Sequence, residues 1–204
     1  MSLPTPYYQD DYATIYHGDC REILPHLPKV DLVLTDPPYG VDFANWDHNL
    51  DFRWLLLAKN LSEIIMVTTG IANIFKWAAP DWIAAYSYPN GFKHAKGGGF
   101  NAWEPVLIYG KNPLKIDHKH FFGASEKVIG HPCPKPLKPF QWLITESSTC
   151  GQTILDPFMG SGTTLVAAKQ LNRKCIGIEL EKKYCEIAAK RLRQEVFNFA
   201  EVSA

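Results

Sequence analysis

Several features that mark secreted, zinc-binding and membrane proteins are missing from this sequence. Its five cysteines include no CxxC pair, so their spacing predicts neither a disulfide framework nor a metal site. The apolar runs, such as Ile64–Val67, stop far short of the about 18 residues that a membrane-spanning helix needs. Residues 1–10 contain no basic start followed by an apolar core, which a signal peptide would have. We therefore expect a cytoplasmic protein with reduced thiols and no membrane partner.

The sequence also has no net charge, because its 21 lysines and arginines balance its 21 aspartates and glutamates. Proteins that bind nucleic acids normally present a basic surface to the phosphates. The charges are nevertheless unevenly spread: residues 1–60 contain four basic and nine acidic residues, whereas residues 91–140 contain eight lysines and three acidic residues. This asymmetry is compatible with one face that meets a polyanion, and equally with a solvated, lysine-rich surface.

Strand and helix patterns alternate along a chain whose 204 residues suit a single domain. Two short aliphatic runs, Val30–Thr35 and Thr153–Leu155, each end at an Asp-Pro pair and are typical of buried parallel strands. Further strands are expected at Ala13–His17, Ile64–Thr69, Ile83–Tyr88, Pro105–Tyr109 and Cys175–Ile178, and helices at Thr163–Leu171 and Glu181–Phe199. The alternation predicts an α/β protein with a Rossmann-like, doubly wound, mostly parallel sheet that binds ligands at the carboxyl ends of its strands. Residues 110–140 show no clear period and are expected to be irregular structure inserted in this fold.

A strand, a glycine turn and a helix start follow one another in residues 154–164, which read ILDPFMGSGTT. Gly160 and Gly162 allow the backbone to approach a ligand closely, because they have no Cβ. Thr163 or Thr164 is expected to cap the helix that follows. The segment is therefore a candidate cofactor-binding turn.

Glu179 lies nineteen residues after Gly160, at the end of the next expected strand. In a Rossmann-like sheet an acidic residue at this position binds the hydroxyls of a ribose. A dinucleotide fingerprint would require glycine where this chain has Leu165, and the Gly-Lys-Ser/Thr of a phosphate-binding loop is absent. The pattern favours a nucleoside with a ribose and no phosphate, a description that S-adenosylmethionine fits. A structural glycine turn without a ligand is the alternative.

Asp36-Pro37-Pro38-Tyr39 follows the first buried strand, so Asp36 is expected at the carboxyl edge of the sheet. The two prolines fix two φ angles and remove two amide donors, which leaves a rigid wall of carbonyl acceptors. Asp36 and the Pro37 carbonyl are suited to accept both N–H bonds of an aromatic amine and to direct its lone pair toward a methyl sulfonium. Tyr39 offers a face for stacking a base that has been flipped out of a duplex. A proline-rich turn that merely ends a strand is the alternative.

Taken together, DPPY at 36–39, DPFMGSGTT at 156–164 and GIE at 177–179 resemble the amino-group DNA methyltransferases. The catalytic motif precedes the cofactor motif, an order similar to the permuted, or β, class of this family. The resemblance implies the class I methyltransferase fold, S-adenosyl-L-methionine as cofactor and double-stranded DNA as substrate. It also implies methyl transfer to adenine N6 in preference to cytosine N4, because N4 enzymes more often have serine in place of Asp36.

The resemblance assigns roles to individual residues. Asp36, Pro37, Pro38 and Tyr39 would be catalytic. The cofactor would be bound by Asp19, Cys20 and Asp36, by His131 and Lys135, by Asp156, Pro157, Phe158, Gly160, Ser161, Gly162, Thr163 and Thr164, and by Glu179 and Leu180. Asp19 would contact the adenine end of the cofactor and Glu179 its ribose hydroxyls. His131 and Lys135 belong to a segment that would close over the methionine end.

Residues 110–130 are the expected target-recognition segment within a single methyltransferase domain that spans residues 1–204. About twenty residues provide little surface for reading a DNA sequence, so we expect a short target site or help from a second subunit in a homodimer. A partner restriction endonuclease is a further expectation, since this class includes many restriction-modification enzymes.

Three other functions stay open. Cytosine N4 methylation uses the same geometry and is the main alternative. Cytosine C5 methylation requires a nucleophilic cysteine, for which Cys133 is the candidate, although that covalent mechanism would not require DPPY. A DNA-binding relative that has lost catalysis is the alternative of a different class, and it predicts that the chain does not bind S-adenosylmethionine.

Overall fold

The computed structural model describes residues 3–38, 52–93, 100–122 and 135–194. The strands are β1 (Tyr8–Gln9), β2 (Ala13–His17), β3 (Leu32–Thr35), β4 (Ile64–Thr68), β5 (Trp82–Lys93), β6 (Phe100–Gly110), β7 (His118–His120), β8 (Thr153–Asp156) and β9 (Lys174–Glu179). The helices are α1 (Cys20–Ile23), α2 (Arg53–Lys59), α3 (Leu137–Ser147), α4 (Thr163–Gln170) and α5 (Lys182–Arg193), with short 3-10 segments η1 (Leu24–His26) and η2 (Ile71–Lys76).

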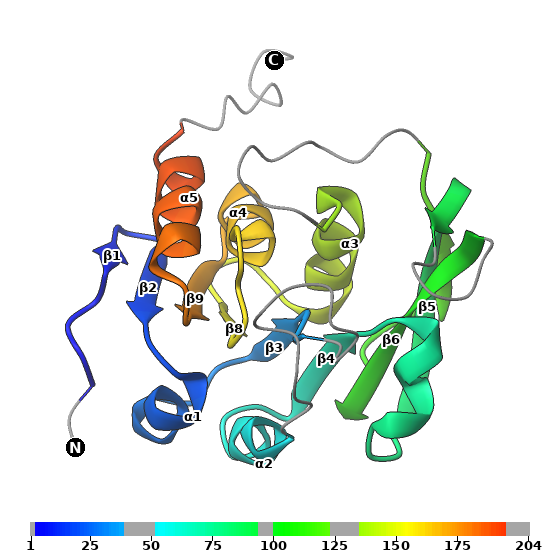
Figure 1. The fold of residues 1–204 in the computed structure, drawn as a ribbon, viewed down its shortest axis with the longest axis horizontal. Coiled ribbons are helices and arrows are strands. Elements are labelled where there is room, and N and C mark those ends of the chain that lie inside the picture. Colours follow the sequence, from blue (N-terminus) through cyan, green and yellow to red (C-terminus); the bar gives the residue numbers. More distant parts are fainter. Residues whose placement is uncertain (1–2, 39–51, 94–99, 123–134, 195–204) are drawn as a thin grey trace.

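One sheet with the strand order β1-β2-β9-β8-β3-β4-β6-β5-β7 runs through the protein. Helices α3, α4 and α5 cover one face of it, and α1 and α2 cover the other (Figure 1). The five strands β2, β9, β8, β3 and β4 pair in parallel. The predicted Rossmann-like, mostly parallel α/β fold is therefore confirmed.

The strand order reverses between β3 and β8. The chain continues from β3 outward to β4 on one side, and from β8 outward to β9 on the other. In doubly wound sheets this reversal opens a crevice beyond the carboxyl ends of the strands, where ligands bind. Asp36 follows β3 and Asp156 ends β8, so the fold brings the two predicted motifs to the reversal point.

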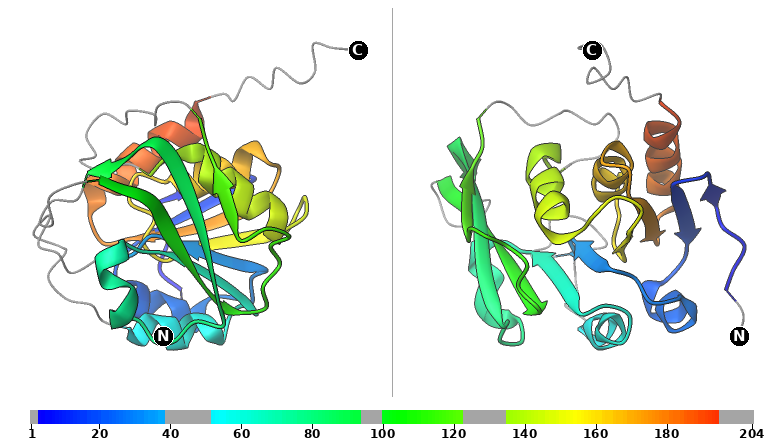
Figure 2. Two further views of the ribbon diagram at one scale, coloured as in Figure 1. Left: turned by 90° about the vertical axis from the view of Figure 1, so that its right-hand side faces the viewer. Right: turned by 180° about the vertical axis from the view of Figure 1, so that it is seen from behind.

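Three strands extend the sheet on the side of β4, and Figure 2 shows them together at one end of the protein. β6 pairs with β4 in the antiparallel direction, with Thr68 opposite Val106. The residues of β6 before Val106 therefore lie at the edge where β4 ends. This direction places Glu104, two residues before Val106, near the carboxyl edge of the parallel strands.

The core has two layers, one on each face of the sheet. Met66, Ile108, Phe140, Leu143 and Leu165 belong to the layer under α3 and α4. The opposite layer, under α1 and α2, contains Leu24, Val33, Trp54, Val67 and Trp77. All four residues of β3 are buried, as expected of a parallel strand that is covered on both faces. No helix in the described segments is both long enough and apolar enough to cross a bilayer.

The expected irregular stretch at 110–140 was partly wrong. Among its described residues, β7 adds a strand to the sheet, and α3 begins at Leu137. The prolines of this stretch do not prevent the helix, because Pro136 is the N-cap residue of α3 and Pro139 lies in its first turn. The first amides of a helix have no intrahelical acceptor, so proline is tolerated there. The expected helix at 181–199 is confirmed as far as Arg193, and residues after 194 lie outside the described part of the chain.

Two glycines with left-handed backbones provide a matched test of the contact between the glycine turn and α5. Gly162 has φ +80° and a Cβ added there would lie 2.8 Å from the Cβ of Ala188. Gly151 has φ +83°, and a Cβ added there would meet none of the described residues within 4 Å. We expect Gly151→Ala to lower the free energy of unfolding by about 1 kcal/mol, the cost of the left-handed conformation alone. Gly162→Ala should lower it by roughly 2–4 kcal/mol, because α5 must also move. Urea unfolding of both variants measures the difference, and equal losses would contradict a tight contact with α5.

Candidate active site

Four of the parallel strands end at an acidic residue or are followed by one at the carboxyl edge of the sheet. Glu179 ends β9 and Asp156 ends β8, while Asp36 directly follows β3 and Asp19 follows β2. Parallel strands end at one edge of a sheet, so residues from distant parts of the sequence come together here. The predicted cofactor and catalytic motifs thus lie on neighbouring strands.

Asp156 is buried and its carboxylate is surrounded by donors. The Thr35 hydroxyl donates to Oδ1 at 2.6 Å, the Phe158 amide donates to Oδ1 at 3.0 Å, and the Thr164 hydroxyl donates to Oδ2 at 2.5 Å. Burial raises the pKa of Asp156 to about 6, although the hydrogen bonds lower it. Asp156 therefore joins β3, β8 and α4 inside the protein, and its predicted contact with the cofactor stays a prediction.

The glycine turn lies against β9 and α5. Gly160 and Gly162 have φ values of 51° and 80°, which side chains with a Cβ rarely adopt. The Met159 amide donates to the Ile178 carbonyl at 3.1 Å, and Arg191 donates to the Ser161 carbonyl at 2.7 Å. Within residues 157–164, positions 158 and 160 are partly exposed and the others, among them Pro157, are buried. The turn is thus fixed by contacts to β9 and α5.

The predicted threonine cap of α4 was wrong. Gly162 is the N-cap residue, and no side chain of the described residues caps this helix. The Thr164 hydroxyl instead donates to Asp156, and the Thr163 hydroxyl donates to the Lys135 carbonyl at 3.3 Å. Both threonines face tertiary partners that local sequence spacing does not reveal.

Glu179 links the glycine turn to the start of α5. Its Oε2 accepts from the Gly160 amide at 3.0 Å, and its Oε1 accepts from the Glu181 amide at 2.7 Å. Burial raises the pKa of Glu179 to about 7. Each carboxylate oxygen can accept more than one hydrogen bond, so Glu179 can hold the turn and still bind a ligand's hydroxyls.

The ends of β2 and β9 lie beside each other and carry the remaining predicted cofactor residues. The Gly18 amide donates to the Glu179 carbonyl at 2.9 Å. Asp19 caps α1 by accepting from the Arg21 amide and also pairs with the Arg21 guanidinium. Cys20 is buried, whereas Leu180 is 61% exposed. The adenine contact predicted for Asp19 stays a prediction.

Two groups in the described part of the chain hold one carboxylate oxygen of Asp36. Thr68, at the end of β4, donates its hydroxyl to Oδ1, and the Nζ of Lys135 lies 3.3 Å from the same atom. The two prolines of the motif follow directly. Tyr39 lies outside the described residues, so its stacking role stays a prediction. The orientation of Asp36 thus depends on β4 and on the segment before α3.

Lys135 connects the catalytic and cofactor halves of the site. Its ammonium forms ion pairs with Asp36 and Glu104, and its carbonyl accepts from the Thr163 hydroxyl. The sequence indicated Lys135 as a cofactor residue but not its contact with Asp36. Glu104 was missed, although an acidic residue inside the apolar strand pattern WEPVLIY was a visible signal. His131, from the same predicted element as Lys135, lies outside the described residues.

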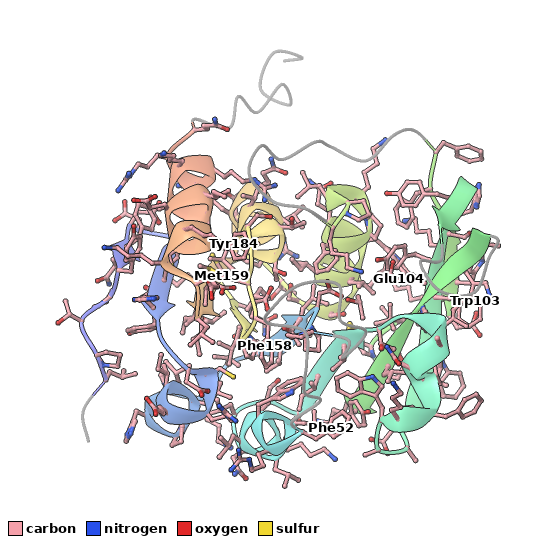
Figure 3. The ribbon with its side chains drawn as sticks, in the orientation of Figure 1. Phe52, Trp103, Glu104, Phe158, Met159 and Tyr184 are labelled. Carbon is pink, nitrogen blue, oxygen red and sulfur yellow. The ribbon has the colours of Figure 1, made fainter. Side chains whose placement is uncertain are left out.

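Aromatic side chains line the α2 side of this edge. Phe158 of the glycine turn lies edge-to-face against Trp54, with ring centroids 5.1 Å apart. Trp77 lies against both Trp54 and Phe52, and its indole donates to the Thr69 hydroxyl at 3.0 Å. Figure 3 shows Phe158 and Phe52 in this layer. The cluster therefore ties the cofactor turn to the end of β4, next to Thr68.

Known sequences resemble this chain over most of its length. A profile of the DNA methylase family matches residues 59–190. Type II methyltransferase M2.LlaDCHI of Lactococcus lactis subsp. cremoris is 28% identical, covering 94% of this chain and 93% of that protein. Type II methyltransferase M.HpaI of Haemophilus parainfluenzae is 32% identical, covering 84% of this chain and 70% of that protein. DNA adenine methyltransferase YhdJ of Escherichia coli (strain K12) is 26% identical, covering 91% of this chain and 84% of that protein.

Solved structures share the fold. The M1.HpyAVI–SAM complex superposes with a TM-score of 0.70 at 26% identity, covering 88% of this chain and 99% of that chain. PvuII DNA methyltransferase, described as cytosine-N4-specific, superposes with a TM-score of 0.72 at 19% identity, covering 96% of this chain and 91% of that chain. At the lower identity the likeness concerns the fold alone.

The bond from Thr35 to Asp156 predicts a pH-dependent stability effect. The pKa of Asp156 is about 6 in the folded protein and 3.8 ordinarily, so its burial costs stability above pH 6 and costs less as the group becomes protonated. Thr35→Val removes one donor to the charged form and should lower the free energy of unfolding by about 1–3 kcal/mol at pH 8. The loss should be smaller at pH 5. Urea titrations at both pH values measure it, with Thr153→Val at the other end of β8 as control; an equal loss at both pH values would contradict this role.

Proposed function

This chain belongs to the DNA methylase family of amino-group methyltransferases, and on that premise we propose that it methylates adenine N6 in a short double-stranded DNA site. The observation that carries the choice of base is Asp36 as the first residue of DPPY, a position where the N4 enzymes more often have serine. A relative that is 26% identical is named a DNA adenine methyltransferase, and we extend that specificity to this chain.

S-Adenosylmethionine is the cofactor of this enzyme, and the residues at the carboxyl edge fit it. Glu179 offers carboxylate oxygens suited to two ribose hydroxyls, and the turn at Gly160 and Gly162 offers close backbone approach without a phosphate-binding lysine. When bound, S-adenosylmethionine supplies an electrophilic methyl group, whose transfer leaves the C–S electron pair on sulfur and the positive charge on the accepting nitrogen. We propose that Glu179 binds the ribose and that the backbone of the glycine turn approaches the methionine part of the cofactor.

Asp36 is proposed to act on the target amine. Its carboxylate accepts an amino N–H, which orients the nitrogen lone pair and holds a negative charge beside the nitrogen that becomes positive. Thr68 and Lys135 fix the carboxylate for this task. After transfer the nitrogen loses its proton to Asp36, from which it passes to water. Positioning and electrostatics together account for catalysis at an amine that is a poor nucleophile.

Target recognition is proposed for residues 110–130, of which the structure describes 110–122. Ile116 and Phe122 are 50% and 72% exposed in this part. β7 runs parallel to β5, so Phe122 follows it at the edge where the Asp36 motif lies. Ile116 precedes β7 and so lies away from this edge, whereas the exposed ring of Phe122 at the edge suits contacts with base edges or with an opened duplex. A homodimer and a partner restriction endonuclease stay predictions from the sequence.

The proposed base and the proposed role of Asp36 are tested together. DNA from cells that express the wild-type chain should contain N6-methyladenine on nucleoside analysis, and DNA from cells that express Asp36→Ala should contain none. Because Asp36 acts on the amine, calorimetry should show that the variant binds S-adenosylmethionine with nearly unchanged affinity.

Other outcomes assign other functions. N4-methylcytosine as the product would replace adenine with the main alternative. If Asp36→Ala loses cofactor binding as well as transfer, Asp36 belongs to the cofactor site or to the fold. A wild-type chain that does not bind S-adenosylmethionine would indicate a relative without catalysis.

Glu179 predicts how nucleoside binding depends on pH. The hydroxyls of the ribose donate to the charged carboxylate, whose pKa is about 7. Binding should therefore weaken as pH falls through 7, by roughly tenfold between pH 8 and pH 6. 5′-Methylthioadenosine is the ligand to titrate by calorimetry, because it shares the ribose and has no group that ionises in this range. Glu179→Gln should bind more weakly with little pH dependence, whereas Glu181→Gln should retain the pH dependence with a slightly lower midpoint, because the Glu181 charge helps to raise the pKa of Glu179. A wild-type profile in Glu179→Gln would remove this residue from the ribose site.

A further inference from the structure

Lys135 lies between two carboxylates at the catalytic edge. Its Nζ is 3.3 Å from Oδ1 of Asp36, and it forms a second ion pair with Oε1 of Glu104. The side chains of Lys135, Glu104 and Asp36 are 13%, 10% and 23% exposed. Charges so far removed from water are weakly screened, so each of them affects the others strongly.

The position of Glu104 is set by the sheet. β6 enters this edge antiparallel to β4, and Glu104 lies beyond the Thr68–Val106 pair. Neighbouring residues of a strand point to opposite faces, and Figure 3 shows Glu104 and Trp103 on opposite sides of β6. Glu104 is buried, whereas Trp103 is 36% exposed. A buried acid within an apolar strand costs stability unless a cation pairs with it, and that cation is Lys135.

These three side chains contribute directly to the charge that the proposed target amine meets at Asp36. Asp36 and Lys135 alone would sum to zero, whereas Glu104 brings the group to a net charge of −1. Methyl transfer places a positive charge on the nitrogen beside Asp36. A lysine that neutralised Asp36 would oppose this charge, and the second carboxylate offsets that opposition.

We propose that Glu104 is a positioning residue for methyl transfer. It holds the Lys135 ammonium so that Lys135 can orient Asp36 without removing the net negative charge at the amine site. This role rests on the proposed function, in which Asp36 receives the target amine. Because Glu104 acts through Lys135 and Asp36, its loss should affect the chemical step more than the binding of either substrate.

Glu104→Gln in the full chain is the first test. The substitution keeps the side-chain shape and removes the charge, so kcat at saturating cofactor should fall roughly 10- to 100-fold. The KM for DNA and the calorimetric affinity for S-adenosylmethionine should change little, while the melting temperature falls because Lys135 loses a buried partner. Glu104→Asp keeps the charge and should stay within a few-fold of the wild-type kcat. Glu63→Gln breaks the exposed Lys111–Glu63 ion pair, whose side chains are 74% and 77% exposed, and is the control for a surface charge.

The double variant Glu104→Gln/Lys135→Met separates charge balance from packing. It removes one negative and one positive charge, which returns the net charge at Asp36 to −1. Its kcat at saturating cofactor should exceed that of Glu104→Gln, although Lys135→Met alone lowers the rate by releasing Asp36. A purely structural ion pair predicts the reverse, because the double variant disturbs more contacts.

Two results would overturn the proposal. One is a wild-type kcat in Glu104→Gln, and the other is a double variant no faster than that single variant. If Glu104→Gln does not fold, Glu104→Asp provides the test. A Glu104→Asp chain that folds but loses as much kcat as Asp36→Ala would also contradict the proposal. A wild-type chain that transfers no methyl group to DNA would contradict the proposed function itself, which distinguishes the two failures.

Discussion

The hydrogen bond between Thr35 and Asp156 is the contact on which the site depends. It spans 2.6 Å between residues that are 121 positions apart in the chain. Thr35 immediately precedes Asp36, and Asp156 opens the glycine turn. The bond therefore fixes the catalytic strand against the cofactor strand at the point where the strand order reverses. Because Asp156 is 2% exposed, water does not compete for it, and the relative position of the two halves is defined from inside the protein.

Electrostatics at this edge follow from the same arrangement. The parallel strands deliver carboxylates to one place. Among the described residues, Lys135 contacts Asp36 and Glu104, and Arg21 contacts Asp19. A negative edge suits a cofactor with a sulfonium and a reaction that moves its positive charge onto an amine. The burial that makes the charges effective also raises the pKa of Asp156 and Glu179. The burial of these carboxylates therefore both supports catalysis and costs stability.

The amino-acid sequence was sufficient to predict the features that depend on residues close together in the chain. The alternation of strands and helices indicated the sheet, and the Asp-Pro pairs after two apolar runs indicated which strands meet at the site. Glu104 and Thr68 were not found, because their contacts with Lys135 and Asp36 depend on the antiparallel direction of β6 and on the end of β4. Local rules also failed for Thr163 and Thr164, whose hydroxyls bind tertiary partners instead of capping α4. The start of α3 was hidden by prolines that a first helical turn accepts.

The buried acids have a consequence for how long the protein survives in a cell. Because the pKa values of Asp156 and Glu179 are higher in the folded protein than their ordinary values, the folded state binds protons more tightly than the unfolded chain. The stability contributed by these two groups is full at acidic pH and is lost as pH rises through about 6 and about 7. A ligand that donates hydrogen bonds to Glu179 stabilises the folded state by mass action. Bound S-adenosylmethionine would then raise the free energy of unfolding of this protein and so slow its proteolysis.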